Sequence, residues 1–252
     1  MSLLSIISDA SDIIGLPTVS QVIGNNDKNV RQMLALLQSG GDALARMTNS
    51  QGGSWVVLDR IREFQSVIDE TEYDLPDDFK SLLTETAWIK EKYWKMRGSL
   101  NPRQWQTLRN RSSTTAYNVF RIVRGTSVGT ITPGTPQNAV KKFTLEPAPG
   151  DSETLVYEYR SNAWWISSDG NAFKKRPTAD TDESLFGDEI SLLDVIWRFK
   201  QQNGLNYAAD LAIFEDSRDT AFAQDGAFES IPIGYDRRST GNKDESDVEW
   251  CR

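Results

Sequence analysis

The chain has 252 residues and a formal net charge of −8, from 36 acidic and 28 basic side chains. This length allows one large domain or two small ones with a buried core, and the excess of acid argues against a protein that binds nucleic acid through general phosphate contacts. The sequence has no histidine and a single cysteine, Cys251, which excludes a Ser-His-Asp triad, histidine metal ligands, an internal disulfide and a cysteine metal cluster.

The periodicity of apolar residues changes along the chain and predicts four parts. These are a first helical part with short strands (1–117), an inserted antiparallel β module (118–186), a second helical part (187–228) and an extended C-terminal arm (229–252). We therefore predict an α+β fold: a helical body with an inserted antiparallel β module and an extended C-terminal arm. No apolar run approaches the ~20 residues of a membrane-spanning helix, and we expect no membrane partner.

The first part begins with two predicted helices. Apolar residues at helical spacing predict helices at 2–14 and 27–47, and Asp27 is placed to cap the second. Gly40-Gly41 interrupts the second pattern, and each glycine costs about 1 kcal/mol relative to alanine inside a helix. Alternatively, the two glycines permit a neighbouring helix to approach closely. Large apolar anchors then predict strands within 55–68.

The stretch EYDLPDDFK at 72–80 carries four acids around Pro76. A glycosidase needs two carboxyl groups held across a bond, and a calcium loop needs a glycine-containing turn with spaced oxygens. Neither pattern is present, and the proline with its apolar neighbours favours a structural corner in which Asp77 or Asp78 caps a following turn. A helix start is predicted shortly afterwards, with Asn101 as its cap and proline at its first position.

The β module is predicted from alternation of apolar and polar residues. The predicted strands are 118–125, 141–147 and 153–160. In the last of these, Leu155, Tyr157 and Tyr159 share one face, which indicates a half-buried strand. Acids at 179–184 lack the spacing of a calcium loop and are interpreted as part of a solvated loop.

Two adjacent tryptophans, Trp164 and Trp165, stand beside a predicted turn in the same module. Successive side chains of a strand point to opposite faces, so we expect one to lie in the core and the other to be exposed. An exposed tryptophan indicates an interface to another protein or to another subunit, and a sugar-binding surface is the alternative.

The second helical part and the arm complete the chain. Helical periodicity predicts helices at 188–203 and 206–224, and Gly204 ends the first of them. Residues 229–252 lose this periodicity and are predicted to be an arm without a core of its own. Residues 187–252 hold 14 acidic and 7 basic side chains, so the negative charge is concentrated here.

Four stretches together resemble the head-to-tail adaptor (connector) proteins of tailed bacteriophages. They are YDLPDDF at 73–79, LNPRQW at 100–105, YEYRSNAWWISSDG at 157–170 and LLDVIWRFKQQNGLNYA at 192–208. The resemblance covers about 55–225 and rests on the order and spacing of these motifs, which are loose when taken singly. None of them is catalytic, so the resemblance implies a structural protein without an active site, a cofactor or a metal.

The resemblance implies a ring of about twelve identical chains beneath the portal protein, in the neck between the capsid vertex and the tail of the virion, made in the host cytoplasm. The helical body would line a channel through which double-stranded DNA passes without specific binding, and an acidic surface suits such sliding. The β module would face outward or toward the next tail or nozzle protein. Residues 229–252 would dock on the portal, with the apolar residues of this polar segment as anchors: Ile231, Ile233, Tyr235 and Trp250.

Two other functions stay open. A carbohydrate-binding or adhesion module of a phage tail would use Trp164 or Trp165 as its sugar platform. A cell-wall hydrolase would need two carboxyl groups about 5–10 Å apart in a cleft, and no pair in the sequence stands out.

Overall fold

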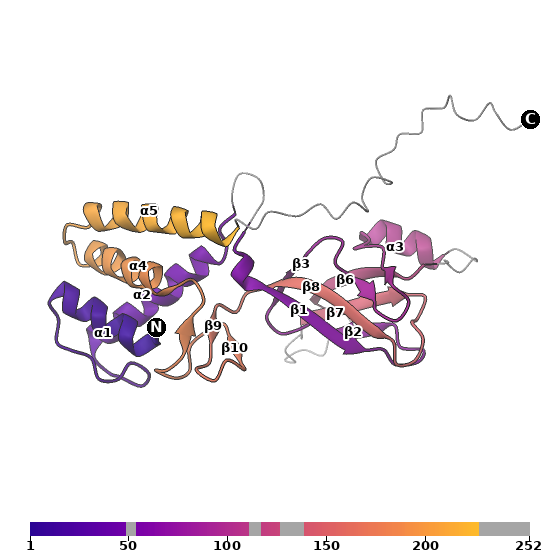
Figure 1. The fold of residues 1–252 in the computed structure, drawn as a ribbon, viewed down its shortest axis with the longest axis horizontal. Coiled ribbons are helices and arrows are strands. Elements are labelled where there is room, and N and C mark those ends of the chain that lie inside the picture. The colour runs from indigo at the N-terminus through magenta and orange to yellow at the C-terminus, as the bar shows by residue number, and fades with distance from the viewer. Residues whose placement is uncertain (49–53, 111–116, 127–138, 227–252) are drawn as a thin grey trace, which may run out of the picture.

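A computed structural model describes residues 1–48, 54–110, 117–126 and 139–226. These residues form an elongated molecule with two lobes, one mainly helical and one built from β-sheets (Figure 1). We define the helical lobe as residues 1–58 and 162–226, and the β lobe as residues 59–161. Helices and antiparallel sheets in one chain confirm the predicted α+β class.

The helical lobe is organised around one central helix. Its elements are α1 (Leu3–Ile14), α2 (Lys28–Leu44), α4 (Asp188–Gln202) and α5 (Ala208–Asp225), the 3₁₀-helix η1 (Val56–Leu58), and a small sheet of β9 (Trp165–Ile166), β10 (Phe173–Lys174) and β11 (Glu183–Ser184). Helix α4 contacts α1, α2 and α5, and α5 lies along the outer side of the lobe (Figure 1). The predicted cap of α2 is confirmed, because the Asp27 carboxylate accepts hydrogen bonds from two backbone N–H groups of its first turn.

The two glycines of α2 are explained by close contacts with other elements. A Cβ atom on Gly40 would lie 1.5 Å from the Oδ2 atom of Asp194 in α4, and one on Gly41 would lie 2.2 Å from the ring of Trp164. Any side chain at these positions would therefore collide with its neighbour. The interpretation that the glycines permit a close approach is confirmed, for a helix at Gly40 and for an indole ring at Gly41.

The β lobe is a sandwich of two antiparallel sheets. Its elements are β1 (Asp59–Gln65), β2 (Glu72–Asp74), β3 (Phe79–Leu82), β4 (Trp88–Ile89), β5 (Trp94–Lys95), α3 (Pro102–Arg109), β6 (Val119–Thr126), β7 (Ala139–Glu146) and β8 (Thr154–Ser161). One sheet has the order β1-β8-β4-β5, with β3 also paired to β8, and the other has the order β2-β7-β6. Tyr157 of the first sheet stacks on Phe143 of the second with ring centroids 5.0 Å apart, so aromatic residues fill the space between the sheets.

Each lobe has its own hydrophobic core, and the limits of the two lobes in the sequence differ from the predicted limits of the helical body and the β module. Strand β1 pairs with β8 along seven residues, from Asp59 opposite Arg160 to Gln65 opposite Thr154. The short strands expected in 1–117 therefore belong to the β lobe, whereas 162–186 packs into the helical core. Alternation of apolar residues predicts a strand but does not say which strand it pairs with, and this explains the shifted boundaries.

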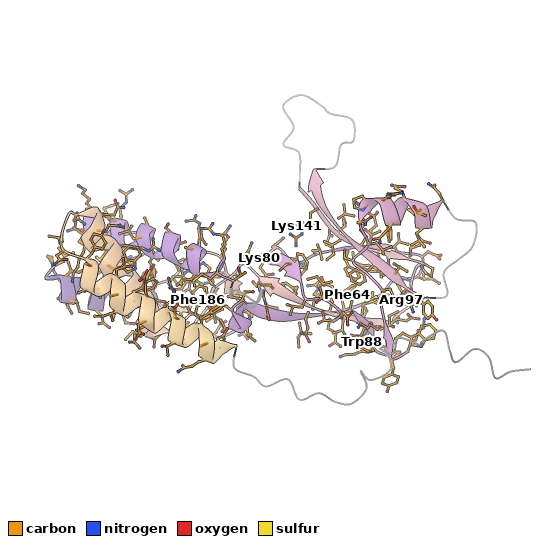
Figure 2. The ribbon with its side chains drawn as sticks, turned by 90° about the horizontal axis from the view of Figure 1, so that it is seen from above. Phe64, Lys80, Trp88, Arg97, Lys141 and Phe186 are labelled. Atoms are coloured by element: carbon orange, nitrogen blue, oxygen red, sulfur yellow. The ribbon has the colours of Figure 1, made fainter. Side chains whose placement is uncertain are left out.

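The stretch EYDLPDDFK forms a corner between β2 and β3, as predicted, but its acids do not cap a turn. The Asp78 carboxylate accepts hydrogen bonds from the hydroxyl groups of Tyr159 (3.0 Å) and Ser161 (2.6 Å) at the end of β8. Lys80 donates to the Ala45 carbonyl oxygen at the end of α2 (2.6 Å) and lies where the two lobes meet (Figure 2). The corner thus ties the β lobe to the helical lobe.

A second polar contact joins the lobes at the end of α5. The Asp225 carboxylate accepts hydrogen bonds from the backbone N–H groups of Val56 and Val57, the latter at 3.2 Å. These amides belong to η1, which leads directly into β1. The last described turn of the chain is thereby anchored at the junction, and the predicted arm, 229–252, follows it in sequence.

Candidate functional site

The two predicted interface tryptophans are both inside the helical core. Trp164 and Trp165 are each 0% exposed, and their ring centroids lie 4.8 Å apart. The expectation that one of them is exposed is wrong, and neither can serve as a surface contact or a sugar platform in this fold. Trp164 precedes β9 instead of lying within it, so the alternation of a strand does not separate the two rings. Its indole N–H donates to the Asp42 carboxylate at 3.2 Å.

The other predicted site residues lie outside the described part of the chain. They are the four arm anchors, Ile231, Ile233, Tyr235 and Trp250. Their role stays a prediction.

Two of the three acids in 179–184, Asp180 and Asp182, are held by hydrogen bonds within the protein, and only Glu183 is exposed, which corrects the interpretation as a solvated loop. Asp182 is 1% exposed, and its carboxylate binds the Lys174 ammonium (2.8 Å) and two backbone N–H groups. The Asp180 carboxylate accepts from the backbone N–H groups of Val22 and Ile23. Through these contacts the segment 179–184 binds strand β10 of the small sheet and the loop that follows α1.

A group of exposed aromatic residues in the β lobe was not singled out from the sequence. The hairpin of β4 and β5 leaves Trp88, Tyr93 and Trp94 exposed by 42%, 87% and 51%. Ile89, which follows Trp88 in β4, is fully buried in the aromatic core of the β lobe. The signal was available in WIKEKYWK at 88–95, where three large aromatics stand among lysines and one apolar residue. We call Trp88, Tyr93 and Trp94 the hairpin aromatics.

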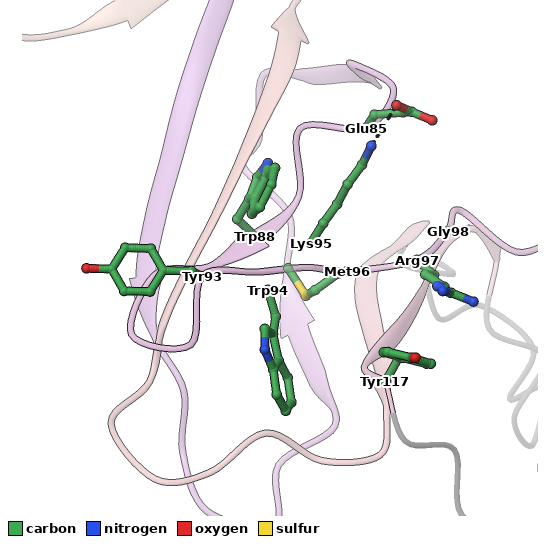
Figure 3. A pocket seen from close by; sticks show the side chains of 9 residues that line it. All are labelled: Glu85, Trp88, Tyr93, Trp94, Lys95, Met96, Arg97, Gly98 and Tyr117. Carbon is green, nitrogen blue, oxygen red and sulfur yellow. Dashed lines mark hydrogen bonds and ion pairs between the residues drawn. The ribbon is translucent and has the colours of Figure 1, made fainter. Parts of the chain in front are cut away.

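Two cavities border these residues, and both are lined by Glu85, Trp88 and Tyr93. The first has a volume of about 590 Å³ and continues past Trp94 to Tyr117 (Figure 3). The second, of about 550 Å³, continues over the outer face of β8. Both volumes fall within the roughly 300–1,000 Å³ of typical ligand pockets. The hairpin is therefore a candidate binding site that combines pocket volume with exposed aromatic residues.

Charged groups around the hairpin are largely paired with one another. Lys95 extends toward Glu85 and binds its carboxylate at 2.6 Å (Figure 3), and this hydrogen bond lowers the pKa of Glu85. Lys90 binds Glu63 at 2.6 Å on the neighbouring strand. The Arg97 guanidinium lies 4.3 Å from the centroid of the Tyr117 ring. The site therefore presents aromatic surface framed by neutralised polar groups.

The described residues contain no cluster of three or more acidic or cysteine side chains placed to hold a metal ion. In the same part of the chain, no helix has both the length and the apolar character needed to cross a bilayer. No protein-family model and no curated protein matches the sequence.

Proposed function

We propose that this chain is a structural virion protein, a head-to-tail adaptor that joins the portal of a tailed bacteriophage to its tail. In this proposal about twelve copies form a ring, the helical lobes line the DNA channel, and the β lobes point toward the tail component. The function requires no catalytic residue and no cofactor.

The observation that carries the proposal is the way in which the two lobes share one chain. The β lobe is inserted between α2 and α4, so segments far apart in sequence build one helical lobe. This is the arrangement that the resemblance to adaptor proteins implies, and the motif YDLPDDF lies at the junction. The end of α5 is anchored at the same junction by Asp225, and the proposed portal-binding arm follows it in sequence.

The charge of the helical lobe supports a channel-facing role. Helix α5 contacts α4 with one side, and Glu215, Asp216 and Asp219 are exposed on it. Such a surface repels the phosphate groups of DNA. DNA would therefore pass along it without releasing counterions and without binding.

The test uses the chain and the portal protein of the same virus. The mass of their complex is measured by light scattering, for the full-length chain and for a truncation that ends at Gly226. We expect the portal ring to gain about twelve full-length chains and few or no truncated ones. If the full-length chain does not bind the portal, the adaptor proposal fails.

A matched pair of variants then tests the arm itself. The first replaces Ile231, Ile233, Tyr235 and Trp250 by serine. The control replaces four polar residues of the same segment by alanine: Ser230, Thr240, Asn242 and Ser246. We expect the first variant to lose portal binding and the control to retain it, because apolar anchors carry most of the energy of an interface. Equal binding by both variants would contradict the assignment of the anchors.

A further inference from the structure

The hairpin aromatics offer exposed ring surface together with hydrogen-bond groups that have no partner in the protein, although the Lys92 ammonium lies over the Trp94 ring, 5.6 Å from its centroid. Within the described residues, the indole N–H groups of Trp88 and Trp94 and the Tyr93 hydroxyl group have no hydrogen-bond partner, and no other aromatic ring stacks on them. Each residue therefore presents an apolar face and a free polar atom side by side. Figure 3 shows the rings of Trp88 and Trp94 on the two sides of the β5 backbone, while Tyr93 extends away from them.

The pairing of the charges narrows the chemistry of a ligand. Glu158, which lines the second cavity, forms no ion pair within the described residues. Glu85 is held by Lys95, Lys90 is held by Glu63, and Arg97 lies over the Tyr117 ring, so an ionic ligand at these groups would have to displace an existing partner. A neutral ligand would not. The ligand must also satisfy hydrogen-bond groups between the rings, because burying them unpaired costs roughly 1–3 kcal/mol each. An aliphatic surface meets the first condition but not the second, whereas a sugar ring, with C–H faces and hydroxyl edges, meets both.

The shared lining of the two cavities indicates a ligand longer than one sugar ring. Both cavities include Trp88 and Tyr93, and each also has lining of its own, Trp94 in the first and Val156 in the second. A single ligand could therefore pass from one to the other around the edge of the hairpin. From these features we infer that the β4–β5 hairpin binds a neutral oligosaccharide, with Trp88 and Trp94 as stacking platforms.

The site is suited to binding and not to hydrolysis. A glycosidase needs a carboxylic acid with a raised pKa to protonate the leaving group. The hydrogen bond from Lys95 lowers the pKa of Glu85, the carboxyl group that borders both cavities, and keeps it ionised. The binding inference stands whether or not the chain is an adaptor, because it rests on the hairpin alone.

The test is isothermal titration calorimetry of the full-length chain with four neutral probes: cellohexaose, maltohexaose, laminarihexaose and chitohexaose. We expect at least one of them to bind, and we expect Trp88→Ala and Trp94→Ala each to weaken that binding by about tenfold, the effect of losing one stacked ring. Trp94→Phe keeps a ring and should retain most of the affinity. Circular dichroism of each variant establishes that it is folded.

Ile213→Ala is the matched control, because Ile213 is an exposed apolar residue of similar accessibility (53%) in the other lobe. It should leave glycan binding unchanged. Absence of binding by all four probes overturns the inference, as does binding that survives both tryptophan-to-alanine changes. A folded Trp94→Ala variant that loses portal or tail binding, in a chain that binds no glycan, also overturns it and assigns the hairpin to a protein interface.

Discussion

The helical lobe and the β lobe differ in charge. The helical lobe carries 16 acidic and 9 basic side chains, a net charge of −7, while the β lobe carries 14 acidic and 15 basic ones, a net charge of +1. In the β lobe several of these charges form ion pairs across the sheet surface, as Lys142 does with Asp74. In α5, Glu215 and Asp216 are exposed and form no ion pair within the described residues, whereas Asp210 pairs with Lys200 and Asp219 with Arg218. The excess negative charge is therefore a property of one lobe and indicates that the two lobes face different surroundings.

The cores of the two lobes also differ in kind. The helical core is mainly aliphatic and closes around Trp164, which sits against Gly41. The β core is richer in aromatic residues, since six of its twelve buried residues are Phe or Tyr. The stability of the helical lobe should therefore depend on steric fit, and that of the β lobe on keeping tyrosine hydroxyl groups neutral.

The largest effects should come from removing one central ring from each core. Trp164→Ala and Phe143→Ala should each cost about 3–5 kcal/mol, because both side chains are fully buried. If the two lobes unfold independently, hydrogen exchange should accelerate in α2 and α4 for Trp164→Ala and in β6, β7 and β8 for Phe143→Ala. Ile213→Ala serves as an exposed control with little effect. Equal acceleration in both lobes by either variant would show that they unfold as one unit.

Gly41→Ala tests the steric fit of the helical core. Helix propensity alone would stabilise the variant by about 1 kcal/mol. The added methyl group would, however, lie 2.2 Å from the Trp164 ring, and overpacking of this kind costs typically 1–3 kcal/mol. We expect net destabilisation in denaturant unfolding. Ser39→Ala, at the exposed neighbouring position of α2, should be neutral or slightly stabilising, and a stabilised Gly41→Ala chain would mean that the indole can move.

Steric fit of this kind also marks the limit of what the sequence could predict. Helix limits were predictable because caps and apolar spacing are local, as at Asp27 and at Asn101, which forms the capping box of α3. The pairing of strands was not predictable, because β1 and β8 are separated by about ninety residues of chain. The burial of Trp164 and the exposure of Trp88 likewise depend on which surfaces meet, and a single sequence does not encode that in its spacing.

Alkaline pH should destabilise the β lobe selectively. Burial raises the pKa of Tyr157, and burial together with the Asp78 charge raises that of Tyr159 to about 12. Because unfolded tyrosine loses its proton near pH 10, the native state holds more protons between about pH 10 and 12, and stability falls as the pH rises, by up to about 1.4 kcal/mol per pH unit for each group. Hydrogen exchange in this range should report opening of the β lobe first.

Tyr157→Phe gives the matched control for alkaline unfolding. The Tyr157 hydroxyl group is buried and has no hydrogen-bond partner within the described residues, so its removal should cost little at neutral pH. The variant should lose stability less steeply above pH 10 than the parent chain. An unchanged slope would contradict the assignment to this tyrosine.

Titration of a buried carboxyl group, Asp194, should act on the helical lobe instead. Burial raises the pKa of Asp194, although Arg198 opposes this effect with an ion pair at 2.8 Å. The native state then holds a proton that the unfolded state releases near pH 4, so stability declines as the pH rises from there toward the native pKa, by at most about 1.4 kcal/mol per pH unit. Asp194→Asn should remove this decline, and parallel stability curves for the two chains would contradict it.

The smallest effect on stability, and the sharpest test of the charge difference, concerns α5. Replacing Glu215, Asp216 and Asp219 by lysine should change stability by only about 0.5 kcal/mol per site, because all three side chains are exposed. If α5 faces the DNA channel, the complex of this variant with the portal should retain double-stranded DNA at low salt, and the parent complex should not. The salt dependence of retention should steepen by about one unit for each new lysine that contacts a phosphate.

The control for α5 places the same charge reversal on the other lobe. Asp69, Glu70 and Glu72 are exposed acids of the β lobe, and their replacement by lysine changes the net charge of the chain by an equal amount. Net charge alone would make both variants retain DNA equally. Retention by the α5 variant only would place the acidic helix on the path of DNA, because phosphate attraction falls off within about one Debye length, ~10 Å at 0.1 M salt.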